Sequence, residues 1–247
     1  MILAAGKGTR LRPVTDSTPK PLLQVAGRPM IAFPLQLLRD AGIREVVVNL
    51  HHLGAQIRRQ LGDGSAYGVH IVYSEEDPIL DTGGALAAAR SFLERDTFVV
   101  LNADTFIEVR LQEVIDFHRR QGALATMVLR ADEQRNDRIR IDASHRIRRI
   151  FDQPQPGPGS AAAQGDGGIL PNRFMYAGVL VFEPRVFRYL PPGAYSITRD
   201  VYPRLLAAAE PLYGYVYDGY WRVLDTPEDL AAGRREIPAR LAPIVRP

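Results

Sequence analysis

Cationic side chains gather near the amino terminus, next to closely spaced glycines. Between residues 7 and 20 there are four cations and a single acid, Asp16. Glycines let backbone N–H groups approach phosphate oxygens closely, and the cations would neutralise the phosphate charge. This density suits a triphosphate better than a neutral metabolite. We call residues 6–20 the cationic loop; its glycines are Gly6 and Gly8, and its cations are Lys7, Arg10, Arg12 and Lys20.

The type of cation in this loop is also informative. Only two of the 31 basic residues of the chain are lysines, Lys7 and Lys20, and both lie in the first twenty residues. Arginine has a planar guanidinium, whereas lysine carries a compact ammonium. We therefore interpret these two positions as sites that need the ammonium.

Two better-known phosphate-binding loops do not fit the cationic loop. A dinucleotide fingerprint has a third glycine and opens directly into a helix, but Leu11 stands at that position and Pro13 follows. A Walker loop has the pattern GxxxxGK followed by Ser or Thr. The sequence around Gly6-Lys7 lacks both that glycine spacing and the hydroxyl after the lysine.

The elements around this loop place it at the edge of a sheet. Met1 to Ala5 is apolar and predicts a short buried strand, and Pro13, Pro19 and Pro21 indicate a long loop after it. In parallel α/β sheets, ligands bind beyond the carboxyl ends of the strands. The cationic loop follows such an end.

Strand and helix patterns then alternate, which is typical of a parallel sheet covered by helices. We expect strands at residues 45–50, 69–73 and 97–101, and helices at 31–41, 53–61, 82–93 and 111–121.

The second half is richer in strands. We expect strands at 123–130, 174–182, 212–217 and 220–225, an antiparallel flap from 137–142 and 146–151, and helices at 199–209 and after a Thr226 cap. Residues 154–171 are poor in bulky apolar side chains and predict an exposed, mobile loop. The expected fold is one α/β domain over residues 1–247, Rossmann-like and mostly parallel, with a nucleotide-binding half (1–122) and an acceptor-binding half (123–247).

Composition excludes several classes of protein. No apolar run reaches the roughly 20 residues of a membrane span, the net charge of +3 is spread along the chain, and there is no cysteine. We therefore expect neither membrane nor nucleic-acid binding and a cytoplasmic location. The oligomeric state stays open, a homo-oligomer included, and we expect further strand residues upstream of Ile2.

The motifs of this chain resemble a known family. The segment LAAGKGTRLRPVTDSTPKPLLQVAGRPMI (residues 3–31) is similar to the signature of the sugar-1-phosphate nucleotidyltransferases, above all their mannose-1-phosphate guanylyltransferase-like branch. The similarity continues through LDTGGALAAA (80–89), LNADTF (101–106), YAGVLVFEP (176–184), SITRDVYPRL (196–205) and YWRVLDTPEDL (220–230). The family fold, a Rossmann-like mixed sheet, agrees with the elements predicted above.

The resemblance implies an enzyme that moves an NMP group from an NTP to a sugar 1-phosphate, a hexose or heptose, with Mg²⁺ as cofactor. It implies that Arg10 holds the β and γ phosphates, that Lys20 reaches the α-phosphate, and that Asp104 binds the metal ion. The nucleotide-binding residues that it implies are Ala5, Gly6, Gly8, Thr9, Gly83 and Gly84, and the acceptor-binding ones are Gln153, Tyr176 and Gly178.

Three departures from the family concern the metal and the acceptor. Val223 stands where the family has a second metal-binding Asp, and Asp225 takes the place of a glycine; Gln153 replaces a lysine, and Tyr176 replaces an asparagine. Either Asp225 joins the metal site through a local backbone shift, or one protein carboxylate and the phosphates hold the ion, or the site is lost.

These departures keep two other functions open. One is a non-catalytic regulatory protein that binds a nucleotide sugar. The other is a cytidylyltransferase acting on phosphocholine, for which Tyr176, Tyr220 and Trp221 are candidate aromatics, although a packing role is favoured for them. For His51 and His52 we favour hydrogen bonding at a strand end over metal binding, since adjacent side chains point apart.

Overall fold

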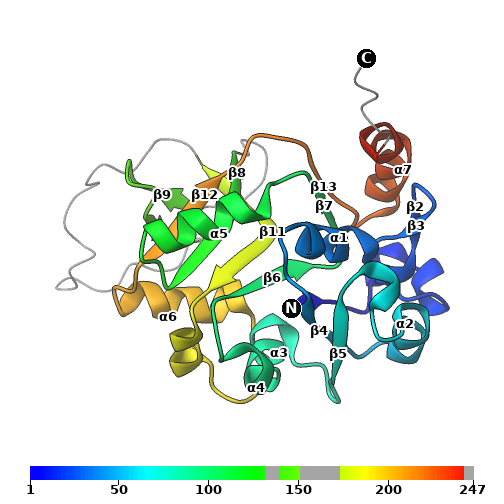
Figure 1. Cartoon of the computed structure of the whole chain (residues 1–247), viewed down its shortest axis with the longest axis horizontal. Coiled ribbons are helices and arrows are strands. Elements are labelled where there is room, and N and C mark those ends of the chain that lie inside the picture. The colour runs from blue at the N-terminus through cyan, green and yellow to red at the C-terminus, as the bar shows by residue number, and fades with distance from the viewer. Residues whose placement is uncertain (132–138, 151–172, 242–247) are drawn as a thin grey trace. The chain divides into compact units, whose positions relative to one another are not determined.

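The computed structural model describes residues 1–131, 139–150 and 173–241 (Figure 1). The chain divides into two compact units, each built from separate segments. Unit 1 comprises Met1, Ile79–Val100 and Val109–Gly219, and unit 2 comprises Ile2–Pro78, Leu101–Glu108 and Tyr220–Pro247. The predicted loop at 154–171 lies outside the described residues.

The main sheet has seven strands in the order β12-β8-β11-β6-β1-β4-β5, and strand β6 (Phe98–Asn102) contributes to both units. In unit 2, β1 (Ile2–Leu3) pairs in parallel with β6 and with β4 (Glu45–Leu50), and β4 pairs in parallel with β5 (His70–Glu75). This part is the parallel sheet that the sequence predicts.

Unit 1 adds the antiparallel strand that makes the sheet mixed. Strand β8 (Ala125–Ala131) pairs antiparallel with β11 (Phe174–Phe182) and parallel with β12 (Leu212–Val216). Helix α5 (Leu111–Arg120) packs on these three strands and buries Leu111, Val114, Ile115 and His118. Their spacing is that of one helix face.

The remaining helices follow the predicted segments with local breaks. They are α1 (Ala32–Asp40), α2 (Gly54–Leu61), α3 (Asp81–Ala88), α4 (Arg90–Leu93), α6 (Tyr202–Ala207) and α7 (Pro227–Leu241). The predicted helix at 82–93 is two helices that meet at Ala89. The one at 199–209 is preceded by a π-helical turn, Ile197–Val201, and ends earlier. None of the helices among the described residues is both long and apolar enough to traverse a bilayer.

Three two-stranded antiparallel sheets complete the fold. The predicted flap is confirmed by β9 (Arg140–Ile141) and β10 (Ile147–Arg149), although its strands are shorter than expected. Strands β2 (Gln24–Val25) and β3 (Arg28–Pro29) form a hairpin, and β7 (Thr105–Ile107) pairs with β13 (Trp221–Val223). The sequence did not predict β2, β3 or β7.

An apolar cluster in unit 2 joins these pieces. It contains Leu11 from the cationic loop, Phe106 from β7, Leu224 after β13, and Leu230 and Ile237 from α7. Leu224 and Ile237 are fully buried. The cluster therefore ties the cationic loop and the β7–β13 pair to the last helix.

Candidate active site

The cationic loop turns sharply at Gly8. Its φ of 62° is left-handed, a conformation that favours glycine. A Cβ atom at Gly8 would lie only 2.9 Å from Cγ2 of Thr15 and 3.1 Å from Cβ of Lys20. The Thr15 hydroxyl donates a hydrogen bond of 2.9 Å to the Gly8 carbonyl oxygen. The loop thus folds back on itself and brings Lys20 beside the glycine turn.

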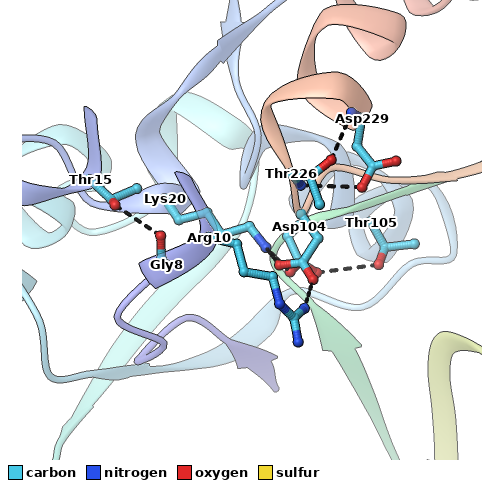
Figure 2. Close-up of polar contacts among 9 residues, drawn as sticks. Gly8, Arg10, Thr15, Lys20, Asp104, Thr105, Thr226 and Asp229 are labelled. Carbon is cyan, nitrogen blue, oxygen red and sulfur yellow. Dashed lines mark hydrogen bonds and ion pairs between the residues drawn. The ribbon is translucent and has the colours of Figure 1, made fainter. Parts of the chain in front are cut away.

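Lys20 is buried between two carboxylates of unit 2 (Figure 2). Its ammonium nitrogen lies 2.5 Å from Oδ2 of Asp104 and 2.7 Å from Oδ1 of Asp225, while its side chain is only 9% exposed. Arg10 forms a further ion pair with Asp225. Two cations and two anions, which are up to 215 positions apart in sequence, therefore meet at one place.

The β7–β13 pairing brings the two carboxylates together. Val223 lies opposite Thr105, and the Leu224 N–H donates a hydrogen bond of 2.8 Å to the Asp104 carbonyl oxygen. Asp104 directly precedes β7, and Asp225 follows β13. Alternate residues of an extended chain point to the same face. Asp225 is two positions after Val223, so its carboxylate lies on the face where the family's Asp would lie at position 223. Of the three alternatives for the second carboxylate, this geometry favours Asp225.

The first turn of α7 fixes the backbone after Asp225. The Thr226 N–H donates to Oδ2 of Asp229 at 3.2 Å, and the Asp229 N–H donates to the Thr226 hydroxyl at 3.1 Å (Figure 2). This reciprocal arrangement is a helix cap, and it confirms the cap predicted at Thr226. It restricts where the Asp225 side chain can point.

The charges around Asp225 shift its acidity. Burial raises the pKa of this carboxyl group, but hydrogen bonding to Lys20 and the charges of Lys20 and Arg10 outweigh burial, so its pKa is below the ordinary value. Asp225 is thus an anion at neutral pH.

The residues present fit a magnesium ion. Asp104 and Asp225 already share one cation, the Lys20 ammonium, and carboxylate oxygens are the ligands that Mg²⁺ prefers. Among the described residues, three or more metal-ligating side chains do not cluster anywhere. Proteins usually bind Mg²⁺ through one or two carboxylates together with substrate phosphates.

The other predicted residues of the loop are accessible. Gly6 and Thr9 are exposed, and a Cβ atom at Gly6 would meet open space, whereas Ala5 is buried at the end of the first strand. Lys7 is also exposed, and Arg12 pairs with Asp16 at 3.0 Å.

In unit 1, Gly83 and Gly84 are buried against residues 193–195. The Gly83 N–H donates a hydrogen bond of 2.8 Å to the Tyr195 carbonyl oxygen. A Cβ atom at Gly83 would overlap the Tyr195 ring, and one at Gly84 would overlap the Gly193 carbonyl oxygen. Close packing is therefore sufficient to require glycine at both positions, and their predicted contact with base and ribose stays a prediction.

Of the three predicted acceptor residues, the structure describes Tyr176 and Gly178. Tyr176 and Gly178 lie on β11, where the register with β8 shifts between Tyr176 and Leu180. Gly178 has a φ of 87°, so the backbone of this bulge favours glycine. Gln153 lies outside the described residues.

Several other residues show ordinary structural roles. His51 and His52 lie 2.9 Å and 2.8 Å from the carbonyl oxygens of Glu76 and Thr15, which confirms hydrogen bonding for both. The Arg240 guanidinium stacks on the Tyr220 ring, 4.4 Å from its centroid, and Phe106 packs on the same ring. Tyr220 therefore packs as expected and does not present that face to a ligand.

Sequence reasoning missed Thr15 and Leu11. Thr15 braces the Gly8 turn and Leu11 anchors the loop in the apolar cluster. Their only signal was an apolar and a hydroxyl side chain within an otherwise charged, proline-rich loop.

The chain is similar to known proteins over most of its length. Residues 1–239 match the family described as Nucleotidyl transferase. A mannose-1-phosphate guanylyltransferase of Mycobacterium tuberculosis is 34% identical over 98% of this chain and 65% of its own length. An N-acetylmuramate alpha-1-phosphate uridylyltransferase of Neisseria meningitidis is 52% identical, over 44% of this chain and 48% of its own.

A solved structure shows the same fold. A putative glucose-1-phosphate thymidylyltransferase from Bacillus anthracis superposes with a TM-score of 0.79 at 22% identity, covering 96% of this chain and 94% of that one. The chain spans less than two thirds of the first relatives that it matches, from 58% to 65% of their length.

Proposed function

The chain belongs to the nucleotidyl transferase family, and from that premise we propose that it transfers an NMP group from an NTP to a sugar 1-phosphate, a hexose or heptose. A phosphate oxygen of the sugar phosphate forms a bond to the α-phosphorus, and the bond from that phosphorus to the β-phosphate bridging oxygen breaks. Pyrophosphate leaves with the electron pair. In this proposal residues 1–122 and 123–247 work as one nucleotidyltransferase domain.

This reaction suits a site without a general base. The attacking phosphate oxygen is already an anion, so the protein has to align two anions and neutralise their charge. The observation that carries the proposal is Lys20, a buried ammonium next to the Gly8 turn and two carboxylates. In the proposal Lys20 contacts the α-phosphate and Arg10 contacts the β and γ phosphates.

The other loop residues would hold the nucleotide. Gly6, Lys7 and Thr9 are exposed, and in the proposal the backbone N–H groups from Ala5 to Thr9 bind phosphate oxygens. Asp104 and Asp225 would hold Mg²⁺, which supplies charge neutralisation of the triphosphate when bound. Gly83 and Gly84 would lie against the base and ribose.

The acceptor would lie against β11. Tyr176 is half-buried there and stands where the family has an asparagine, and Gly178 forms the bulge beside it. Gln153 would complete the acceptor site as a neutral donor. The relatives named above act on different bases and sugars, so we propose the reaction class and leave base and acceptor to the assay.

A pyrophosphate assay tests this function. The protein is incubated with Mg²⁺, with GTP, UTP, dTTP or CTP, and with mannose, glucose, heptose or N-acetylmuramate 1-phosphate. We expect stoichiometric pyrophosphate and NDP-sugar from at least one pair, and none without Mg²⁺.

The second candidate, a nucleotide-sugar sensor, is favoured by Val223 and Tyr176, which depart from the family at the metal and acceptor positions. The same assay separates the two. Absence of pyrophosphate with every pair, together with tight binding of an NDP-sugar, would replace the enzyme with the sensor. Phosphocholine with CTP is included as an acceptor from outside the sugars.

A further inference from the structure

We propose that Asp225 couples the binding of the nucleotide to the binding of the divalent cation, because it pairs with both Lys20 and Arg10, the two cations that would bind the triphosphate. The inference rests on the proposed function and concerns how its two ligands enter the site. Asp225 acts here as a positioning residue for Lys20 and Arg10.

Both cations that would grip the triphosphate are already engaged. Lys20 donates a hydrogen bond to Asp104 at 2.5 Å (Figure 2). It donates another to Asp225 at 2.7 Å, and Arg10 pairs with Asp225. Hydrogen bonds between charged groups are stronger than neutral ones. A triphosphate therefore has to displace carboxylates before it can bind these two side chains.

That displacement leaves the two carboxylates without a positively charged partner. When Lys20 and Arg10 turn to phosphate oxygens, Asp104 and Asp225 remain next to each other and next to the triphosphate without a cation. Like charges so close disfavour one another. Asp104 and Asp225 would hold a divalent cation in place of the ammonium, and that ion would supply the missing positive charge. Each ligand alone meets this penalty, and the pair together avoids it.

The residues on both sides of Asp225 are held in place. Leu224, which precedes it, is fully buried and hydrogen-bonded to Asp104, and Thr226, which follows it, caps α7 with Asp229. By contrast, the neighbouring pair of Arg12 and Asp16 is exposed and touches neither carboxylate of the site. The coupling thus depends on the position of the Asp225 side chain, which its neighbours in the chain hold in place.

The first test measures nucleotide binding without metal. Calorimetric titration of a non-hydrolysable NTP analogue, with EDTA or with Mg²⁺, compares the wild type with Asp225→Asn. The matched control is Glu228→Gln, which removes the same charge three residues away on the exposed start of α7.

We expect Asp225→Asn to bind the analogue in EDTA at least about tenfold more tightly than the wild type, because hydrogen bonds to charged groups are each worth about this factor or more. The gain from Mg²⁺ shrinks accordingly, and Glu228→Gln behaves as the wild type. Thermal melting verifies that both variants are folded.

The second test reverses the ligands. Binding of Mn²⁺ alone, followed by electron paramagnetic resonance, compares the wild type with Lys20→Gln and with Arg59→Gln, at an exposed position of α2, as the control. Removal of the ammonium from between the carboxylates strengthens Mn²⁺ binding at least about tenfold, whereas Arg59→Gln leaves it unchanged.

The outcomes separate the inference from the function. Suppose that the wild type binds the analogue in Mg²⁺, but that Asp225→Asn binds it in EDTA no more tightly than the wild type and Glu228→Gln do. The coupling is then wrong, and the proposed function stands. If the wild type binds no nucleotide even with Mg²⁺, the proposed function itself fails.

Discussion

The two units treat their predicted functional residues differently. In unit 2, Lys20, Asp104 and Asp225 are charged side chains that bind one another and remain partly open to solvent, with 26% and 27% of the two carboxylates exposed. In unit 1, Gly83 and Gly84 are buried in close contact with residues 193–195. The first arrangement has charge to offer a ligand, whereas the second is already filled by protein.

The difference shows that the motifs shared with the family contain residues under two kinds of constraint. A residue that must neutralise phosphate is selected for charge, while a glycine that must allow close packing is selected for volume. Substitutions in unit 2 are therefore expected to lower activity, and substitutions in unit 1 to lower stability. Three experiments test that contrast.

The largest expected effect is on turnover. Lys20→Ala, and also Lys20→Arg, should reduce kcat by about 10²–10³, the range for loss of one group that stabilises developing charge. Stability should change little, since both carboxylates still reach water and Arg10 still pairs with Asp225. Pyrophosphate release and thermal melting measure the two quantities. Arg59→Ala, at an exposed position of α2, is the control, and an unchanged kcat in Lys20→Arg would contradict the assigned role.

The next effect is on stability. Gly84→Ala should lower the free energy of unfolding by about 1–3 kcal/mol, as is usual for overpacking, because the added methyl group overlaps the Gly193 carbonyl oxygen. Urea unfolding measures the change against Ala88→Ser, at an exposed position of the same helix. A variant of unchanged stability with a raised KM for the nucleotide would show instead that this glycine faces the ligand.

The smallest effect concerns pH and a buried histidine of unit 1. His118 lies 2.8 Å from the Thr126 hydroxyl and 3.2 Å from Glu183. Burial lowers the pKa of His118 more than its hydrogen bond to Glu183 and the Glu183 charge raise it. The unfolded chain therefore binds the proton more readily than the folded chain.

Because the pKa of His118 is lower in the folded chain, its contribution to stability is complete above the pKa of the unfolded chain, about 6.5. The contribution falls as the pH drops below that value. Urea unfolding between pH 7.5 and pH 5.5 should show a shallower pH dependence for His118→Gln than for the wild type. Equal slopes would mean that His118 has the same pKa in the folded and the unfolded chain, and would contradict the lowered pKa. The carboxyl groups with lowered pKa, such as Asp225 and Asp142, act only at lower pH.

Much of the fold could be predicted because local patterns agree with it. The β-branched segment Glu45–Leu50 and the apolar segment Phe174–Phe182 begin and end as strands at the predicted residues. Strand β7 was missed because three residues carry too little pattern, and its pairing with β13 depends on a segment more than a hundred positions away. The break at Ala89 was missed because every residue near it favours a helix.

The candidate site divides along the same line. Residue types and spacing alone indicated a cationic, glycine-containing loop suited to phosphate, and the scarcity of lysine singled out Lys7 and Lys20. That is possible because charge and backbone freedom are properties of single residues. Asp104 was indicated by the resemblance to the nucleotidyltransferases. Only the tertiary structure decided that Asp225 lies beside Lys20, which also binds Asp104; its role as the second metal-binding carboxylate stays a prediction. The β7–β13 register and the cap of α7 bring its side chain to Lys20, and no local pattern encodes a distance between segments so far apart in the chain.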